Sequence, residues 1–203
     1  MPTAALSSKG RQTRHAIELA ARKLFAERGF HGTTLADITS AAGKSPAVFY
    51  RYFADKEDLL AALAESFLHD VVTPSGSSIP LPESPSDSEF FSSVVTGYWN
   101  MFKQNIGIMI AVAQLAATQQ RFAAVQNEFR RFGMDIVAAS VRRAQEQGYS
   151  AELNAEHTAA AIALLFENFT TVFVGRCGLG LEMSDADAIV TLSTIWKKTL
   201  YGT

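Results

Sequence analysis

Signals that start and stop α-helices follow one another closely near the N-terminus, and they constrain the fold more than any other feature of the sequence. Apolar residues recur at helical spacing over residues 11–28, and Gly29 then favours a helix end. Thr34 and Asp37 have the spacing of a capping box, in which a hydroxyl and a carboxylate satisfy backbone N–H groups at a helix start. The second helix that they begin is short, because Gly43 permits the left-handed turn that ends it.

A third helix is predicted to begin directly after this turn, with Ser45 as its N-cap and Pro46 in its first turn, and to end near Phe53. A fourth helix follows over residues 55–72 and starts at a capping aspartate. Two short helices that meet in a glycine-containing turn, after a longer first helix, have the spacing of a helix-turn-helix. Residues 1–55 are therefore predicted to form a three-helix head.

The third helix of this head divides into an apolar side and a side suited to meet a partner. On a helical wheel with about 100° per residue, Phe49 and Phe53 fall together and predict the side that faces the core. The opposite side and its flanks carry Lys44, Ala47, Val48, Tyr50, Arg51 and Tyr52. Small residues there let a helix enter the major groove of DNA, where Arg51 is placed to bind guanine and Val48 to contact a thymine methyl group.

The distribution of charge supports a nucleic-acid partner for this head. Residues 1–51 hold eight Lys and Arg against three Asp and Glu, a net charge of +5, and because the whole chain carries −2, the rest carries −7. Thr34, Ser45 and Lys56 stand at helix starts, where backbone N–H groups and the helix dipole attract phosphate. The competing interpretation is a small helical bundle with merely solvated Tyr and Arg side chains. The caps, the wheel and the charge agree, and together they favour DNA binding.

Beyond the head, the sequence predicts only further helices. Residues 73–88 are rich in proline and serine and predict a loop, either a tolerated insertion or a segment that gates a ligand pocket. Long apolar helices are predicted over residues 89–105, 108–118, 122–147, 155–174 and 185–201. Ser184 and Asp187 have capping-box spacing at the start of the last one. No segment alternates with period two, so the predicted fold class is all-α, with a multi-helix body over residues 56–203.

The stretch TLADITSAAGKSPAVFYRYFADKEDLL, residues 34–60, resembles the DNA-binding head of TetR-type transcriptional regulators (the TetR/AcrR-like family), and the match extends over residues 11–63. The resemblance implies an all-helical homodimeric repressor that binds a double-stranded DNA operator and holds a small-molecule ligand in its C-terminal body. It also implies that the third helix reads the major groove. The DNA contacts that it implies, mostly to phosphates, come from Thr34, Ser45, Ala47, Tyr50, Tyr52 and Lys56. Two positions depart from the family's pattern: Thr39, where alanine is common, and Lys44, where valine is common and lysine adds a candidate contact to DNA.

The body is rich in aromatic residues and methionines, which at helical spacing form core more often than pocket. An apolar pocket with a few polar groups is nonetheless the expected ligand site of a helical body. The candidate ligand-binding residues are Trp99, Phe102, Met109, Gln114, Phe129 and Asn168. They predict a small, largely apolar ligand with one or two hydrogen-bonding groups. Glu167 and Asn168 interrupt an apolar helix, so they either line such a pocket or face solvent beside a dimer interface.

The last two helices are predicted to form the interface of a homodimer. A helix that is apolar nearly all round must be buried, and in a body of this size two such helices need a partner subunit. The candidate interface residues are Phe173, Ile189, Leu192 and Trp196, three of them on an apolar stripe of the last helix.

Catalysis and metal binding find no support in the sequence. The four histidines lack the spacing of metal ligands, and no catalytic constellation is recognisable, so no catalytic residue, metal or cofactor is predicted. The single cysteine, Cys177, the absence of a signal peptide and the lack of an apolar stretch of about 20 residues predict a cytoplasmic protein without a membrane segment. Two alternatives remain: a DNA-binding regulator without a small-molecule effector, and an α-helical enzyme, which would leave the basic head unexplained.

Overall fold

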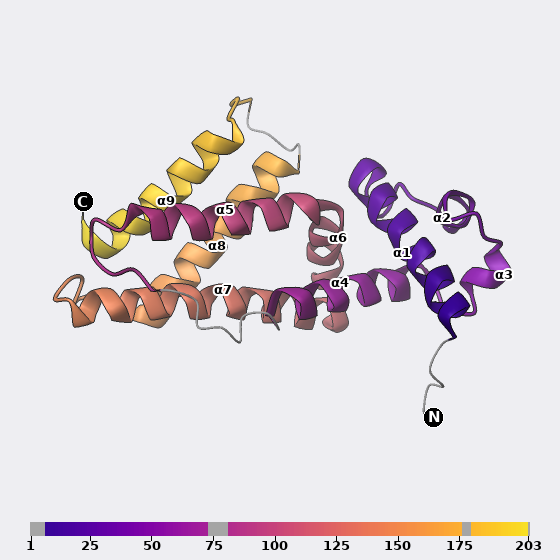
Figure 1. Ribbon diagram of the computed structural model, residues 1–203, viewed down its shortest axis with the longest axis horizontal. Helices are drawn as coiled ribbons and strands as arrows, with labels where there is room; N and C mark the ends of the chain where they lie inside the picture. The colour runs from indigo at the N-terminus through magenta and orange to yellow at the C-terminus, as the bar shows by residue number, and fades with distance from the viewer. Residues whose placement is uncertain (1–6, 73–80, 176–179, 203) are drawn as a thin grey trace. The chain divides into compact units, whose positions relative to one another are not determined.

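The computed structural model describes residues 7–72, 81–175 and 180–202. Within these ranges the chain forms nine α-helices and no β-strand, which confirms the all-α prediction (Figure 1). The helices are α1 (Ser8–Arg28), α2 (Leu35–Ala41), α3 (Pro46–Phe49), α4 (Lys56–Val72), α5 (Ser88–Gln104), α6 (Ile106–Ala116), α7 (Gln120–Glu146), α8 (Ala155–Val174) and α9 (Asp185–Tyr201). The predicted loop over residues 73–88 lies outside the described residues up to residue 80, and its remainder is non-helical as far as the start of α5. Cys177 also lies outside the described residues.

Two helices begin at the capping boxes that the sequence predicts. At the start of α2, the Asp37 backbone N–H donates to the Thr34 hydroxyl over 3.1 Å, and the Thr34 N–H donates to the Asp37 carboxylate over 2.8 Å. Ser184 and Asp187 form the same pair of bonds at the start of α9, over 3.1 and 3.2 Å. Both predicted starts are confirmed, because each box satisfies N–H groups that a helix end leaves without a partner inside the helix.

The third helix is shorter than predicted. It ends at Phe49 rather than near Phe53, because the backbone tightens there into turns: the Tyr52 N–H donates to the Phe49 carbonyl, three residues back, over 2.9 Å. Gly43 makes the preceding turn with the positive φ of 62° that the sequence predicts. The core-facing and outward-facing sides of this segment are nevertheless as predicted, since Phe49 and Phe53 are buried and Tyr50 is exposed.

The chain divides into two compact units. Unit 1 comprises residues 1–67 and 107–125, and unit 2 comprises residues 68–106 and 126–203. Unit 1 therefore contains the helix-turn-helix together with most of α4 and α6, whereas the sequence places a boundary near residue 55. The boundary near residue 55 separates the residues predicted to bind DNA from the body. A division into compact units does not decide which residues bind DNA, so this boundary stays a prediction.

Unit 1 packs α6 tightly against the end of α1. Its core contains Phe25, Phe49 and Phe53 from the head and Ile108 from α6, all buried. A Cβ atom on Gly107 would lie 2.5 Å from backbone atoms of α1, at the carbonyl carbon of Phe25 and the nitrogen of Ala26. Only glycine allows the two backbones to approach this closely.

Unit 2 packs α5, α8, α9 and most of α7 around Trp196, and α9 lies alongside α5 (Figure 1). The Trp196 ring meets Phe91 edge-on at 5.1 Å, and its indole N–H donates to the Ser140 hydroxyl over 3.2 Å. Leu192 and Trp196 are only 0% and 1% exposed in this single chain. Because both side chains are buried in the core of this chain, the prediction that they contact a partner subunit is wrong.

Other apolar residues of α8 and α9 remain on the surface. The exposed ones are Leu164 and Leu165 on α8 and Val190 and Ile195 on α9. Phe173 and Ile189, the other two predicted interface residues, are half-buried. Among the described residues, α8 is the one helix that is long and apolar enough to cross a membrane, judged by length and composition alone. Its surface is therefore unusually apolar for a helix in contact with water.

Candidate functional sites: a helix-turn-helix surface and an apolar cavity

The structure places the predicted DNA-reading residues around α3 and the turns on either side of it. Three of them are exposed, Ala47, Tyr50 and Arg51, and three are half-buried, Lys44, Val48 and Tyr52. The buried rings of Phe49 and Phe53 lie 5.6 Å apart and anchor this segment in the core of unit 1. We call these six exposed and half-buried residues the α3 surface; Ala47 and Val48 lie on α3 itself and the other four in the turns beside it.

The α3 surface keeps an uncompensated positive charge. The three acidic side chains of residues 1–51 each pair with a basic residue of the same segment: Arg14 with Glu18, Lys23 with Glu27, and Arg28 with Asp37. In the part of the chain that the structure describes, Lys44 and Arg51 form no ion pair. Their charges are therefore available to a polyanion such as the DNA backbone.

Two hydroxyl groups that the sequence assigns to phosphate contacts differ in how they are engaged. Ser45 stands at the N-cap of α3, is exposed and makes no side-chain capping bond. The Thr34 hydroxyl donates to the Asp37 carboxylate over 2.5 Å, and its backbone N–H donates to the same carboxylate. Ser45 thus has a donor to offer to phosphate, whereas Thr34 would first have to give up part of its capping box.

Lys56 is also engaged inside unit 1. Its ammonium donates to the carbonyls of Phe30 and Thr33, each over 2.7 Å, and lies 4.3 Å from the centre of the Phe30 ring. Burial lowers the pKa of this ammonium, and the charge of Glu57 partly offsets that effect. These contacts join α4 to the segment between α1 and α2 and leave one N–H of the ammonium without a hydrogen-bond acceptor among them.

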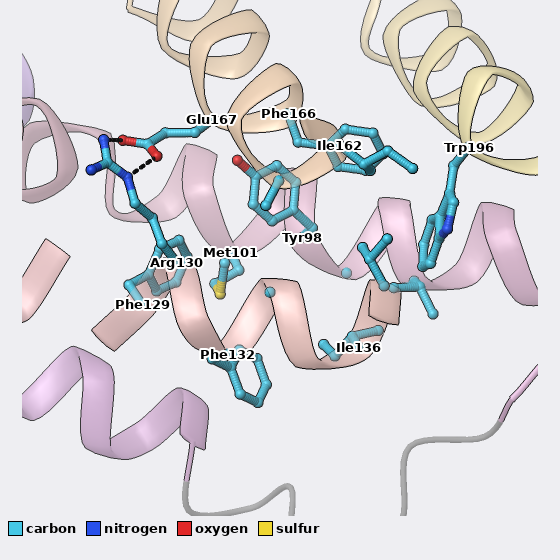
Figure 2. A pocket seen from close by; sticks show the side chains of 15 residues that line it. Tyr98, Met101, Phe129, Arg130, Phe132, Ile136, Ile162, Phe166, Glu167 and Trp196 are labelled. Carbon is cyan, nitrogen blue, oxygen red and sulfur yellow. Dashed lines mark hydrogen bonds and ion pairs between the residues drawn. The ribbon is translucent and has the colours of Figure 1, made fainter. Parts of the chain in front are cut away.

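Unit 2 contains a cavity of about 230 Å³, which we call the unit 2 cavity. Its walls come from α5, α7 and α8, with one residue of α9: Val94, Gly97, Tyr98, Met101, Phe129, Arg130, Phe132, Gly133, Ile136, Val137, Ile162, Ala163, Phe166, Glu167 and Trp196. Figure 2 shows the aromatic and aliphatic side chains around this space, with charged groups at one end. Such a lining suits an apolar molecule that is held by a few polar groups.

The charged groups of the cavity neutralise each other. The Arg130 guanidinium donates to the Glu167 carboxylate through Nε over 2.6 Å and through Nη2 over 2.9 Å (Figure 2). Gln126 donates to the same carboxylate over 2.9 Å. The hydrogen bonds that Arg130 donates to Glu167 raise the pKa of Arg130 despite its partial burial. Because the two opposite charges lie within hydrogen-bond distance, the pair presents little net charge to the cavity.

The Tyr98 hydroxyl is the polar group of the cavity that lacks a partner. It is buried, and neither it nor the buried Thr170 hydroxyl makes a hydrogen bond with any described residue. Burial raises the pKa of the Tyr98 hydroxyl; the Thr170 hydroxyl opposes this shift and the charge of Glu167 adds to it. The phenol is thus a neutral donor at physiological pH. A buried donor left unsatisfied typically costs about 1–3 kcal/mol.

The six predicted ligand-binding residues do not gather in one place. Phe129 lines the unit 2 cavity, and Trp99 lines a second, smaller cavity of about 150 Å³ beside Phe173 and Met183. Phe102 is buried in the interior. The remaining three lie elsewhere: Met109 and Gln114 are on α6 in unit 1, and Asn168 is exposed on α8. Of the two residues that interrupt α8, Glu167 therefore lines the cavity and Asn168 does not.

Sequence reasoning missed Tyr98 and Arg130, because nothing in their local sequence separates them from neighbouring surface or core residues. The stronger signal was a pair of glycines within helices, Gly97 and Gly133. Both line the cavity, and a Cβ atom added to either would meet nothing within 4 Å. Glycine inside a helix is unfavourable, so two of them in long helices point to a space that is kept open.

Comparison with known sequences agrees with the helix-turn-helix. The family model described as bacterial regulatory proteins, tetR family, matches residues 17–63. The HTH-type transcriptional regulator EthR of Mycobacterium tuberculosis is 28% identical over 192 residues, which are 92% of this chain and 86% of that protein. The HTH-type transcriptional repressor AcnR of Corynebacterium glutamicum is 40% identical over 60 residues, 30% of this chain and 32% of that protein.

Solved structures share the fold along nearly the whole chain. The transcriptional regulator FadR of Bacillus subtilis, in complex with stearoyl-CoA, aligns with a TM-score of 0.65 at 18% identity, over 93% of this chain and 98% of that one. The ketosteroid transcriptional regulator KstR2 of Mycobacterium tuberculosis aligns with a TM-score of 0.65 at 18% identity, over 97% of each chain. At this level of identity the likeness concerns the fold alone.

Proposed function

Because this chain is a TetR-type DNA-binding transcriptional regulator, we propose that it is a repressor whose affinity for its operator is lowered by a small, largely apolar ligand in the unit 2 cavity. The observation that carries the ligand part is the cavity itself, with its apolar walls, neutralised ion pair and two helix glycines that keep it open. The FadR relative was solved with stearoyl-CoA, which supports a ligand-binding body in this fold.

For the DNA part, we assign base contacts to Arg51 and Val48 and backbone contacts to Lys44 and Ser45. Arg51 is exposed and carries a charge with no ion-pair partner among the described residues, as bidentate binding of guanine requires. Lys44 adds a second unpaired charge. The remaining predicted contacts are Thr34, Ala47, Tyr50, Tyr52 and Lys56, of which Thr34 and Lys56 are the most engaged in internal bonds.

We further propose that the protein is a homodimer joined through the exposed apolar sides of α8 and α9. Leu164 and Leu165 on α8 and Val190 and Ile195 on α9 replace the buried Leu192 and Trp196 as the residues in the interface. A partner subunit would account for the strongly apolar composition of α8. Two-fold symmetry would present two recognition helices to half-sites about 34 Å apart on DNA.

The ligand would act through its unequal affinity for two states of the dimer. In one state the recognition helices match the spacing of the half-sites, and in the other they do not. Each tenfold loss of operator affinity requires about 1.4 kcal/mol of coupling between the two sites. The helix α4 contributes residues to both compact units. It is therefore the candidate element for transmitting the effect of the ligand from unit 2 to the DNA-binding residues of unit 1.

The proposal is tested by measuring operator affinity with and without a probe ligand. The operator is first selected from a random DNA library with the full-length protein. 4-Phenylbutan-2-one, a small aromatic ketone, then serves as the probe, and its binding is followed separately by calorimetry. We expect saturating ketone to lower operator affinity at least tenfold in the wild type.

The Gly133→Leu variant is the matched control, because the added side chain fills a position where the cavity is open. This variant should bind the operator like the wild type and should neither bind nor respond to the ketone. A wild-type protein that binds the ketone yet keeps its operator affinity would favour the alternative of a DNA-binding regulator without a small-molecule effector.

The dimer is tested by light scattering. Leu164→Glu should produce a folded monomer, because a charge on an exposed apolar side disturbs only an interface. The same change at Leu192 should instead unfold unit 2, since that side chain is fully buried in a single chain. A Leu164→Glu protein that remains a dimer would show that the subunits meet elsewhere.

A further inference from the structure

Four polar side chains line the unit 2 cavity, and three of them have partners. Arg130 and Glu167 bind each other, and the Trp196 indole donates to the Ser140 hydroxyl over 3.2 Å. The fourth is the Tyr98 hydroxyl, which is buried and makes no hydrogen bond within the described ranges of the chain. The cavity therefore offers a bound molecule one unused donor.

The Tyr98 ring is held in place by other rings. Its centre lies 5.8 Å from that of Phe166 and 5.9 Å from that of Phe102. Figure 2 shows the ring between α5 and α8, with the hydroxyl on the side that faces the pair of Arg130 and Glu167. A donor fixed in this way loses little conformational freedom when an acceptor arrives, which favours binding.

The charges around the cavity disfavour an ionised ligand. The Glu167 carboxylate already accepts two bonds from Arg130 and one from Gln126, so the guanidinium is not free to receive a ligand carboxylate. An anion placed beside this pair would meet the negative charge of Glu167, and a cation would meet that of Arg130. A charge buried among apolar walls without its own partner is strongly disfavoured.

We propose that the unit 2 cavity selects an uncharged, mainly apolar molecule with one hydrogen-bond acceptor, a carbonyl-type oxygen that accepts the Tyr98 hydroxyl. The inference deepens the proposed function and rests on it, since it takes the cavity to be the effector site. With about 230 Å³, the cavity is smaller than the roughly 300–1,000 Å³ of common small-molecule sites, which favours a compact ligand. The Thr170 hydroxyl, buried and likewise without a partner among the described residues, acts on the same hydroxyl and competes with a ligand for it.

Three probes of nearly the same shape separate the hydrogen bond from apolar burial and from charge. 4-Phenylbutan-2-one carries the carbonyl, (3-methylbutyl)benzene replaces it by a hydrocarbon branch, and 3-phenylpropanoate replaces the methyl ketone by a carboxylate. Binding of each probe is measured by ligand-observed NMR with the full-length wild type and with Tyr98→Phe. The wild type should bind the ketone at least tenfold more tightly than the carboxylate.

Tyr98→Phe removes the hydroxyl and keeps the ring. It should lower the affinity ratio of ketone to hydrocarbon about tenfold, the effect of one hydrogen bond. Because the ratio is taken within each protein, general changes in packing cancel. Glu167→Gln supplies an independent measurement that does not depend on the folding of Tyr98→Phe. It frees the charge of Arg130, so the affinity ratio of carboxylate to ketone should rise about tenfold.

The outcomes distinguish this inference from the proposed function. If 3-phenylpropanoate binds the wild type as tightly as the ketone, or if Tyr98→Phe leaves the ketone-to-hydrocarbon ratio unchanged, the inference is overturned and the proposed effector role is unaffected. If the ketone binds with the expected dependence on Tyr98 but operator affinity does not change, the inference stands and the effector role is overturned. If none of the three probes binds, both are overturned.

Discussion

The α3 surface and the unit 2 cavity differ in whether their charged groups are balanced by a neighbouring opposite charge. On the α3 surface, Lys44 and Arg51 carry charges that no described acidic residue balances and that water solvates. In the cavity, Arg130 and Glu167 neutralise each other over 2.6 Å, and a neutral hydroxyl is the group left open. A surface can keep free charges at little cost, whereas a buried site must cancel them and rely on neutral hydrogen bonds for selection.

The largest effects should come from the two cores that hold these sites. Phe49→Ala in unit 1 and Trp196→Ala in unit 2 each remove a buried aromatic side chain and should lower the free energy of unfolding by about 3–5 kcal/mol. We expect Phe49→Ala to lose operator binding first and Trp196→Ala to lose ketone binding first. Urea unfolding followed by circular dichroism, together with both binding assays, measures this. If each variant lost both functions at the same denaturant concentration, the two units would unfold as one.

The next largest effect concerns the free charge of the α3 surface. Arg51→Ala should weaken operator binding by about 1–3 kcal/mol and relax the preference at one base pair, because a bidentate contact is lost. Lys44→Ala should weaken all DNA sequences alike and reduce the salt slope by about one unit. Anisotropy titrations over a range of salt concentrations measure both effects. Arg131→Ala, which removes an exposed positive charge from unit 2, is the control and should change neither quantity.

Replacing a helix glycine by alanine should change the free energy of unfolding in opposite directions in the two units. Gly107→Ala forces a methyl group to within 2.5 Å of the α1 backbone and should destabilise the protein by about 1–3 kcal/mol. Gly133→Ala meets nothing within 4 Å in the interior of α7 and should stabilise it by about 1 kcal/mol. Thermal and urea unfolding of both variants measure the difference. A stabilising Gly107→Ala would mean that α6 does not pack against α1 as described.

The smallest effects should come from the two capping boxes, one in each unit. Thr34→Ala and Ser184→Ala should each lower the free energy of unfolding by about 1 kcal/mol, since each leaves a helix start uncapped. Hydrogen bonds from Thr34 lower the pKa of Asp37, and those from Ser184 lower the pKa of Asp187, from an ordinary value of 3.8.

These lowered pKa values predict the sign of a pH dependence. Because the folded state favours the ionised carboxylate, the stabilisation is present above the ordinary pKa and is lost as the pH falls through the lower pKa of the folded state. Unfolding measured between pH 7 and pH 3 should therefore show less acid sensitivity in Asp37→Asn and Asp187→Asn than in the wild type. Equal acid sensitivity in all three proteins would contradict the assigned hydrogen bonds.

The parts of the fold that were predictable from the sequence are those that neighbouring residues decide. The bounds of α8 and α9 and both capping boxes were correct, because a cap is a bond between groups three residues apart. The buried and exposed sides of α3 were also correct. The length of α3 was not, because side-chain periodicity does not reveal that the backbone tightens into turns after Phe49. The stripe on α9 was real, but periodicity alone does not tell which neighbour it faces, and for Leu192 and Trp196 this is the core of the same chain.

An all-helical chain with a basic helix-turn-helix head was predictable from the amino-acid sequence alone. Those properties follow from short-range hydrogen bonds, from side-chain periodicity and from the charges present in the first residues. The position of the unit 2 cavity and the set of side chains that line it depend on how the helices pack. Arg130 and Glu167 are 37 residues apart, and Tyr98 lies on a third helix, so no local pattern relates them. They become one site because α5, α7 and α8 pack around space that Gly97 and Gly133 leave open.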